Sequence, residues 1–382
     1  MIYLDNNATT PVDERVVEAM MPYFTNQFGN AASNHQFGVQ ANDAVRKARR
    51  QIGQLINCDR NEIIFTSGAT EAVNLAIKGA ASAYADKGKH VISVKTEHYA
   101  VLDSCKYLEE IGYDVTYLSV DNDGLIDLEE LKAAFREDTV LVTVMYVNNE
   151  TGVIQSIAEI AEITHENDAI FMTDATQAVG KIPLDVRKMN IDLLAFSGHK
   201  LYAPKGIGAL YVQSRGRHSV KLNAIIHGGG HERGMRSGTL NVPFIVGLGE
   251  ACELARKEMK SNQKHIKALR DHFEQEILKL EGTSINGSQN NRLYNISNVQ
   301  FKGVDADALM LGMPDVMVST GSACTSAHVE PSHVLIAMEF SEQAAFSSLR
   351  FSFGKGNILI EIEKVLENLN TAVKQLRAFQ IH

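Results

Sequence analysis

The chain of 382 residues alternates short apolar runs with longer helical patterns, and several of the runs end abruptly in polar residues. The run at 169–174 ends in Asp174, and the run at 191–196 leads directly into the sequence Ser-Gly-His-Lys at 197–200. Short runs of this kind are typical of strands that are buried on both faces of a parallel sheet. Because open α/β sheets bind their ligands at the carboxyl ends of the strands, these polar residues are candidates for a functional site.

Three further apolar runs, at 62–66, 90–94 and 140–147, also lead into polar residues. The first is followed by a turn of small residues and the start of a helix. Backbone N–H groups and the helix dipole hold a phosphate at such a turn, although the same residues can serve only as a helix cap. The other two runs lead to His98 and Asn149, which either bind a ligand or complete local hydrogen bonding.

Strands that alternate with helices in this way predict a largely parallel, doubly wound α/β sheet. The segment at 205–212 is typical of a further strand that runs back, and the strongly helical pattern at 245–280 is a natural bridge to a second domain. We therefore expect a large domain at 14–257 and a smaller α+β domain formed by 1–13 and 258–382.

Lys200 and Asp174 follow two neighbouring apolar runs. Most lysines at such positions are simply exposed, but a lysine in low-dielectric surroundings favours the neutral amine and can act as a nucleophile or base. A carboxylate on the neighbouring strand end is the partner that pyridoxal phosphate (PLP) needs. The carboxylate keeps the pyridine nitrogen protonated, and the lysine holds the aldehyde. The pair therefore indicates a PLP site.

Composition excludes several classes of function. A formal net charge of -9 argues against nucleic acid as the main ligand. We find no apolar run long enough to cross a bilayer and no leader pattern at the amino end, so we expect a cytoplasmic protein without a membrane partner.

The four cysteines lack Cys-x-x-Cys spacing, which fits reduced thiols. Three glycines separate His227 from His231, which argues against a helical pair of metal ligands, and we expect no metal.

Cys324 lies in a run of small, mostly polar residues at 319–327. A free cysteine is usually a small buried hydrophobic residue, and that interpretation suits Cys252 in its helical segment. It suits Cys324 poorly, because the segment around this residue offers little to pack against. An exposed thiol on a loop can instead move between an active site and an acceptor, and its thiolate is a nucleophile.

The motifs Asp174-x-x-Gln177 and Ser197-Gly-His-Lys200 resemble those of the cysteine desulfurases, which are PLP enzymes of fold type I in the class V aminotransferase group. The resemblance extends from the Leu-Asp-Asn-Asn-Ala-Thr-Thr segment at 4–10 to Ser-Leu-Arg-Phe-Ser at 348–352. The Cys324 segment is similar to the catalytic loop of the housekeeping and nitrogen-fixation branch. The resemblance implies the two-domain fold expected above.

The resemblance also implies roles for individual residues. Lys200, His98 and Cys324 would be catalytic, and Asn34, Asn149 and Arg350 would bind the substrate. Thr239 would reach the PLP phosphate of a partner subunit, which implies a homodimer with shared sites. The full set of residues implied to bind the cofactor is Ala69, Thr70, His98, Asn149, Asp174, Gln177, Ser197, His199, Lys200 and Thr239.

The implied reaction converts L-cysteine to L-alanine and leaves a persulfide on Cys324. The sulfur would then pass to an Fe-S scaffold or another sulfur-acceptor protein. A PLP aminotransferase of the same fold would keep Lys200 and Asp174 but have no use for Cys324, and a selenocysteine lyase would share the lysine. A non-catalytic scaffold that had lost the chemistry would take up no PLP.

Overall fold

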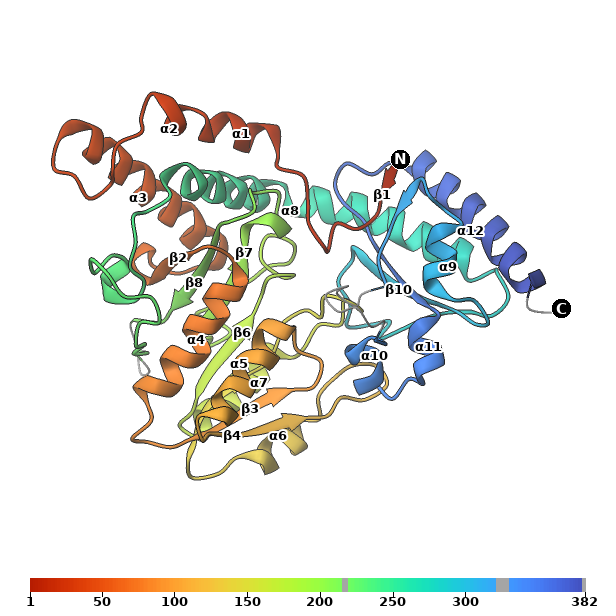
Figure 1. The fold of residues 1–382 in the computed structure, drawn as a ribbon, viewed down its shortest axis with the longest axis horizontal. Helices are drawn as coiled ribbons and strands as arrows, with labels where there is room; N and C mark the ends of the chain where they lie inside the picture. Colours follow the sequence, from red (N-terminus) through yellow and green to blue (C-terminus); the bar gives the residue numbers. More distant parts are fainter. Residues whose placement is uncertain (215–218, 321–329, 380–382) are drawn as a thin grey trace.

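This computed structural model describes residues 1–214, 219–320 and 330–379. Within them, the larger sheet has seven strands in the order β2-β8-β7-β6-β5-β3-β4 (Figure 1). Strands β4, β3, β5, β6 and β7 are parallel to one another, and β8 runs antiparallel to its neighbours β7 and β2. The strands are β2 (Ile63–Thr66), β3 (His90–Val94), β4 (Asp114–Leu118), β5 (Thr139–Thr143), β6 (Ile170–Asp174), β7 (Leu193–Ser197) and β8 (Gly208–Val212).

Helices cover both faces of this sheet, and the alternation of residues along a strand shows why. Ile64 packs into the hydrophobic cluster of one face, whereas its neighbours Ile63 and Phe65 pack into the cluster of the other face. Both faces are therefore buried, as the apolar runs predict, and the sheet is doubly wound. One face carries α4 (Ala69–Ala83) and α5 (Tyr99–Glu110), and the other carries α3 (Gln36–Ile56), α7 (Ile157–Glu166) and α8 (Val242–Ile277).

A smaller α+β unit contains an antiparallel sheet in the order β12-β10-β9. The short strand β1 (Ile2–Tyr3) joins this unit by pairing in parallel with β11 (Val316–Met317). Both ends of the described chain therefore lie on the same side of the molecule (Figure 1). Its elements are β9 (Thr283–Ile285), β10 (Ile296–Phe301), β12 (Ser348–Ser352), α9 (Ala306–Leu311), α10 (His333–Ala337), α11 (Glu342–Phe346) and α12 (Leu359–Phe379).

Helix α8 runs without interruption from the large sheet to the smaller unit (Figure 1). The expected boundary between 257 and 258 falls inside this helix, so the residue limits of the two domains stay a prediction. The helix does form the bridge that the pattern at 245–280 predicts. No helix of the described residues is both long and apolar enough to cross a membrane.

Two strands differ from what the apolar runs indicate. Strand β5 ends at Thr143, although the backbone N–H groups of Val144 and Tyr146 still donate to Met172 and Asp174 of β6. Further on, the Asn148 side-chain oxygen accepts hydrogen bonds from the backbone N–H groups of Glu150 and Thr151, each at 2.9 Å. The sequence pattern also misses β4, a partly exposed edge strand that lacks a continuous apolar run. The remaining helices of the described chain are α1 (Glu14–Met20), α2 (Pro22–Thr25) and α6 (Leu128–Ala134).

Candidate active site

A cavity of about 490 Å³ lies at the carboxyl edge of the large sheet, where it meets the smaller unit. Strands β2 and β7 run in the same direction on either side of β8, so their ends reach this edge together with those of β3, β5 and β6. The cavity collects most of the residues that the sequence singles out. Those lining it are Ala69, Thr70, His98, Asn149, Asp174, Gln177, Ser197, His199, Lys200 and Arg350.

Lys200 ends the short turn that follows β7, and the amino-terminal segment holds its amine. The Nζ atom donates hydrogen bonds to the backbone oxygens of Asn7 and Ala8, the latter at 2.7 Å. Burial and the positive charge of Arg350 lower the pKa of Lys200 to about 8, against the opposing effect of Asp5. The neutral amine, which nucleophilic or base chemistry requires, is therefore far more populated near neutral pH than in an ordinary lysine.

His98 is the N-cap of α5, and this position fixes which ring nitrogen carries the proton. Its Nδ1 atom accepts a hydrogen bond from the backbone N–H of Ala100 at 3.0 Å, so a neutral ring carries its proton on Nε2. Desolvation by the cavity walls lowers the pKa of His98, with Asp174 acting in the opposite direction. The imidazole is consequently kept neutral and can offer an Nε2–H donor within the cavity.

The turn between β2 and α4 has the features of an anion site. The N-cap Gly68 provides no side-chain cap for the N–H groups that begin the helix. The turn itself is held by Glu71, which accepts a hydrogen bond from the Ser67 N–H at 2.7 Å and pairs with Arg236. A Cβ atom on Gly208 would lie 2.7 Å from the Gly68 Cα, so glycine allows β8 to pass close to this turn.

Asp174 and the turn after it form the opposite wall of the cavity. The Asp174 carboxylate is 6% exposed and accepts a hydrogen bond from the Thr176 N–H at 2.9 Å. The Thr176 hydroxyl is buried at this wall and has no hydrogen-bond partner within the described residues. Gln177 donates to the backbone oxygen of Asn7 at 3.1 Å. The wall thus combines a buried anion with polar atoms that a ligand can satisfy.

Arg350, in the centre of β12, brings a cation from the smaller unit. Its guanidinium donates to Asp5 at 2.8 Å, to the backbone oxygen of Asn149 at 3.0 Å and to the Ser319 hydroxyl at 3.1 Å. The side chain is 6% exposed, and its Nε has no hydrogen-bond partner in the described part of the chain. The guanidinium group of Arg350 is therefore already oriented for a carboxylate that enters the cavity.

Two of the predicted residues that the structure describes do not line this cavity. Asn34 and Thr239 are exposed, and their roles stay predictions. Cys324 lies outside the described residues. Among the described cysteines, Cys58, Cys105 and Cys252 are free. Burial raises the pKa of all three thiols, that of Cys105 to about 12, which disfavours the reactive thiolate.

Sequence reasoning did not find Asp5 or the carbonyl groups of Asn7 and Ala8 as parts of the site. Backbone acceptors leave no trace in residue identity, so the contacts to Lys200 had no direct signal. The available signal was indirect. The polar run Asp-Asn-Asn follows the apolar start of the chain directly, as the other polar strand ends follow theirs.

The described residues fit PLP. The uncapped start of α4 suits a phosphate, the buried Asp174 suits a pyridinium nitrogen, and the amine of Lys200 suits an aldehyde. Thr176 also lines this cavity, and its buried hydroxyl has no hydrogen-bond partner within the described residues. An anion site, a buried carboxylate and a partly neutral lysine therefore share one cavity.

Comparison with known proteins gives a consistent result. A family model described as aminotransferase class-V matches residues 2–365. The protein named cysteine desulfurase IscS of Pasteurella multocida (strain Pm70) is 54% identical over 379 residues, covering 98% of this chain and 93% of the relative. A protein of the same name from Haemophilus influenzae (strain ATCC 51907 / DSM 11121 / KW20 / Rd) is 53% identical over 380 residues, covering 99% and 94%.

Solved structures agree with the fold. One described as a NifS-like protein has a TM-score of 0.91 and 36% identity, covering 98% of this chain and 99% of the other. Another, described as SspA in complex with cysteine, has a TM-score of 0.82 and 38% identity, covering 94% and 100%. These likenesses confirm the predicted PLP fold type I. From its residues, its fold and its relatives, the chain belongs to the class-V aminotransferase family, among the cysteine desulfurases.

Proposed function

We propose that this chain is a PLP-dependent cysteine desulfurase that converts L-cysteine to L-alanine and collects the sulfur as a persulfide on Cys324. The observation that carries the proposal is the amine of Lys200, whose pKa is lowered to about 8, in one cavity with Asp174 and Arg350. The overall reaction balances, because L-cysteine and the enzyme thiol give L-alanine and an enzyme persulfide.

The residues of this chain divide the work by their chemistry. Thr70, Asn149, Asp174, Gln177, Ser197 and His199 would hold the coenzyme, with Lys200 at its aldehyde. Bound PLP supplies an electron sink for the bonds at the substrate Cα. Arg350 would bind the substrate carboxylate, which would take the place of part of its contacts with Asp5, Ser319 and the Asn149 carbonyl. The neutral amine of Lys200 takes the Cα proton, and His98 donates or accepts protons at Nε2.

Cys324 is the nucleophile in this proposal. Its thiolate attacks the sulfur of the substrate, the C–S bond breaks toward carbon, and the sulfur remains on Cys324. The raised pKa values of Cys58, Cys105 and Cys252 support this assignment, because they disfavour the thiolate at each of the three described cysteines.

The test is to treat the PLP-loaded enzyme with L-cysteine and to analyse its peptides by mass spectrometry. We expect one added sulfur on the peptide that contains Cys324, together with one L-alanine formed. Cys324→Ser should abolish persulfide formation and reduce turnover with a thiol reductant at least 100-fold. Cys58→Ser, which changes a thiol with a raised pKa, is the matched control and should retain turnover.

Different results point to the alternative activities. If Cys324→Ser keeps full turnover of cysteine with a keto acid, the protein is an aminotransferase of the same fold. If selenocysteine is turned over much faster than cysteine and no persulfide accumulates, it is a selenocysteine lyase. A purified protein that binds no added PLP contradicts the enzyme proposal as a whole.

The proposed partners are a second copy of this chain and a sulfur-acceptor protein, such as an Fe-S scaffold, in the cytoplasm. Thr239 is exposed and lies outside the cavity of its own chain, which supports a role in the site of a partner subunit. Sedimentation of the holoenzyme should give a dimer. A monomer with full activity would contradict the shared site.

A further inference from the structure

Lys181 contacts the predicted coenzyme residue Gln177 from outside the coenzyme cavity. Its Nζ atom donates a hydrogen bond to Gln177 Oε1 at 2.6 Å, and the two residues are one turn apart in the chain. The preceding Gly180 has φ +78°, and a Cβ atom on it would lie 3.1 Å from the Ala255 Cβ in α8, so glycine suits the turn that leads to the lysine.

This contact and the hydrogen bond to the Asn7 carbonyl together set which way the Gln177 amide faces. An amide can present either its oxygen or its NH₂ group to a neighbour, and the two orientations occupy the same space. An ammonium group has donors and no acceptor. With Lys181 on one side, the amide oxygen must face the lysine and the NH₂ group must face the other way.

On that other side lie the groups of the coenzyme cavity. One hydrogen of Gln177 Nε2 is directed at the backbone oxygen of Asn7, at 3.1 Å. The same oxygen accepts a hydrogen bond from Lys200. Gln177 is 3% exposed and lines the coenzyme cavity, so its second N–H is a donor for a ligand there.

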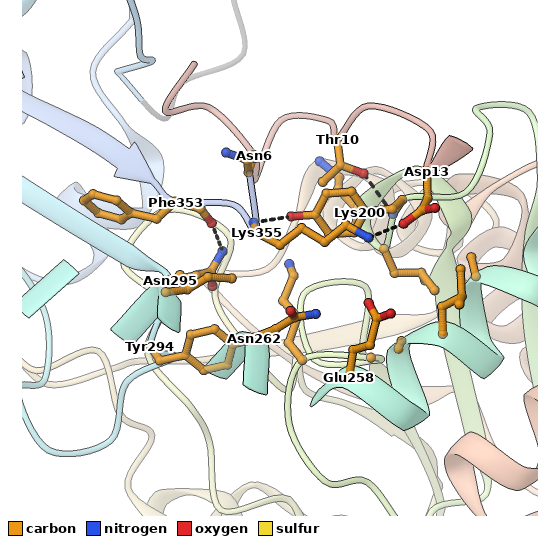
Figure 2. A pocket seen from close by; sticks show the side chains of 18 residues that line it. Asn6, Thr10, Asp13, Lys200, Glu258, Asn262, Tyr294, Asn295, Phe353 and Lys355 are labelled. Atoms are coloured by element: carbon orange, nitrogen blue, oxygen red, sulfur yellow. Dashed lines mark hydrogen bonds and ion pairs between the residues drawn. The ribbon is translucent and has the colours of Figure 1, made fainter. Parts of the chain in front are cut away.

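Lys181 itself faces a second, smaller cavity of about 40 Å³ between the two units, which Lys200 also lines. Figure 2 shows Lys200 beside this space together with Asp13, Glu258 and Lys355. Burial lowers the pKa of Lys181 to about 7, and the positive charges of Lys200 and Arg350 act in the same direction. Keeping a lysine at this position is unfavourable unless the charge has a use.

We propose that Lys181 is a positioning residue: in its ammonium form it holds the Gln177 oxygen and, together with the Asn7 carbonyl, keeps the Gln177 NH₂ group presented to the coenzyme. The inference rests on the proposed PLP-dependent function and adds a residue to its machinery. Lys181 does not line the coenzyme cavity. Its hydrogen bond reaches this cavity through Gln177, and its charge also lowers the pKa of His199, an effect that Lys181→Arg preserves.

The test is a double-mutant cycle read out by the affinity of the coenzyme-free enzyme for PLP, measured from the change in absorbance on titration. Lys181→Met removes the donor and keeps the length of the side chain, and Gln177→Leu removes the amide. We expect Lys181→Met to weaken PLP binding about three- to tenfold, the range for one oriented hydrogen bond. In the Gln177→Leu background the same change should have almost no effect.

Lys181→Arg keeps a donor without an acceptor and should restore most of the affinity, whereas Lys181→Gln, which permits both amide orientations, should not. If Lys181→Met melts early, Lys181→Gln takes its place in the cycle. In turnover, Lys181→Met should lower kcat more than it raises KM for cysteine, because the substrate contacts of Arg350 are unchanged.

Two results would overturn the inference while leaving the proposed function intact: wild-type PLP affinity in Lys181→Met, or equal losses on changing Lys181 with and without Gln177. If instead the wild-type protein takes up no PLP, the proposed function is contradicted and the double-mutant cycle cannot be measured. The two failures are thus distinguished by the first titration.

Discussion

The amine of Lys200 is held by two backbone carbonyls and sits between opposing charges. Burial and Arg350 favour its neutral form, whereas Asp5 and Asp174 favour the ammonium form. Asp5 also pairs directly with Arg350, so one carboxylate moderates both cations. The reactivity of the lysine is therefore set by residues of both structural units.

This balance predicts the pH dependence of coenzyme uptake. An aldehyde reacts with the neutral amine, so the rate at which the coenzyme-free enzyme takes up PLP should rise with pH through about 8, well below the ordinary lysine value. Asp5→Asn removes a charge that raises the pKa of Lys200 and should move the midpoint down. Arg350→Gln removes a charge that lowers this pKa and should move the midpoint up.

Stopped-flow absorbance measures these rates, with PLP and N-acetyl-lysine as the reference for the titration of PLP itself. A midpoint near that of the free amine, or shifts of the two variants in the same direction, would contradict the electrostatic explanation.

At the scale of secondary-structure elements, the site depends on helices that approach each other closely. Helix α8 crosses α3, and a Cβ atom on Gly249 would lie 2.6 Å from the Ala48 Cα and 2.7 Å from the Ala48 Cβ. Glycine is therefore required at this crossing by the neighbouring helix, although its helix propensity is poor. The crossing fixes α8 against the large sheet and so fixes the start of the bridge.

Gly249→Val should lower the melting temperature measurably, because a side chain forced into this contact costs about 1–3 kcal/mol. Gly356→Ala is the control, since a Cβ atom there has nothing within 4 Å and the backbone does not require glycine. Differential scanning calorimetry of both variants checks the prediction. Equal melting temperatures would show that the helices separate at little cost.

The sequence predicts the elements better than it predicts their contacts. Runs such as 169–174 reveal buried strands because burial on both faces requires continuous apolar residues, and the polar residues at their ends then meet at one edge. The half-exposed β4 lacks this signal. The pairing of Arg350 with Asp5 could not be predicted, because these residues are distant in sequence. The contact of Lys181 with Gln177 could not be predicted either, because it depends on the turn between them. The role proposed for Thr239 could not be tested on one chain, because it requires a second copy.

At the scale of the whole molecule, one buried ion pair fastens α8 to the smaller unit. Arg292 donates two hydrogen bonds to Glu274, both at 2.8 Å, and its side chain is 3% exposed. The backbone of Arg292 also bridges to Val153, in the loop that follows β5. The pair thus lies where the long helix, the smaller unit and the loop next to the site meet.

Glu274→Ala should reduce the free energy of unfolding by about 3–5 kcal/mol, because it leaves a buried guanidinium without its partner. The double variant Glu274→Met, Arg292→Met should lose much less, since no unpaired charge remains. Urea unfolding followed by circular dichroism compares both variants with the wild type. If the double variant is as unstable as Glu274→Ala, the unpaired guanidinium is not the cause of the loss.

The amino-terminal segment has a role out of proportion to its length. Within a few residues of β1, Asp5 supports the arginine of the smaller unit, while Asn7 and Ala8 hold the lysine of the larger one. Proteolysis after Ala8 would remove the groups that hold Lys200 and the carboxylate that pairs with Arg350 in a single cut. Every strand of the large sheet would remain in place. An affinity tag fused in front of Met1 would likewise be separated from the chemistry by only a few residues, so purification handles belong elsewhere on this molecule.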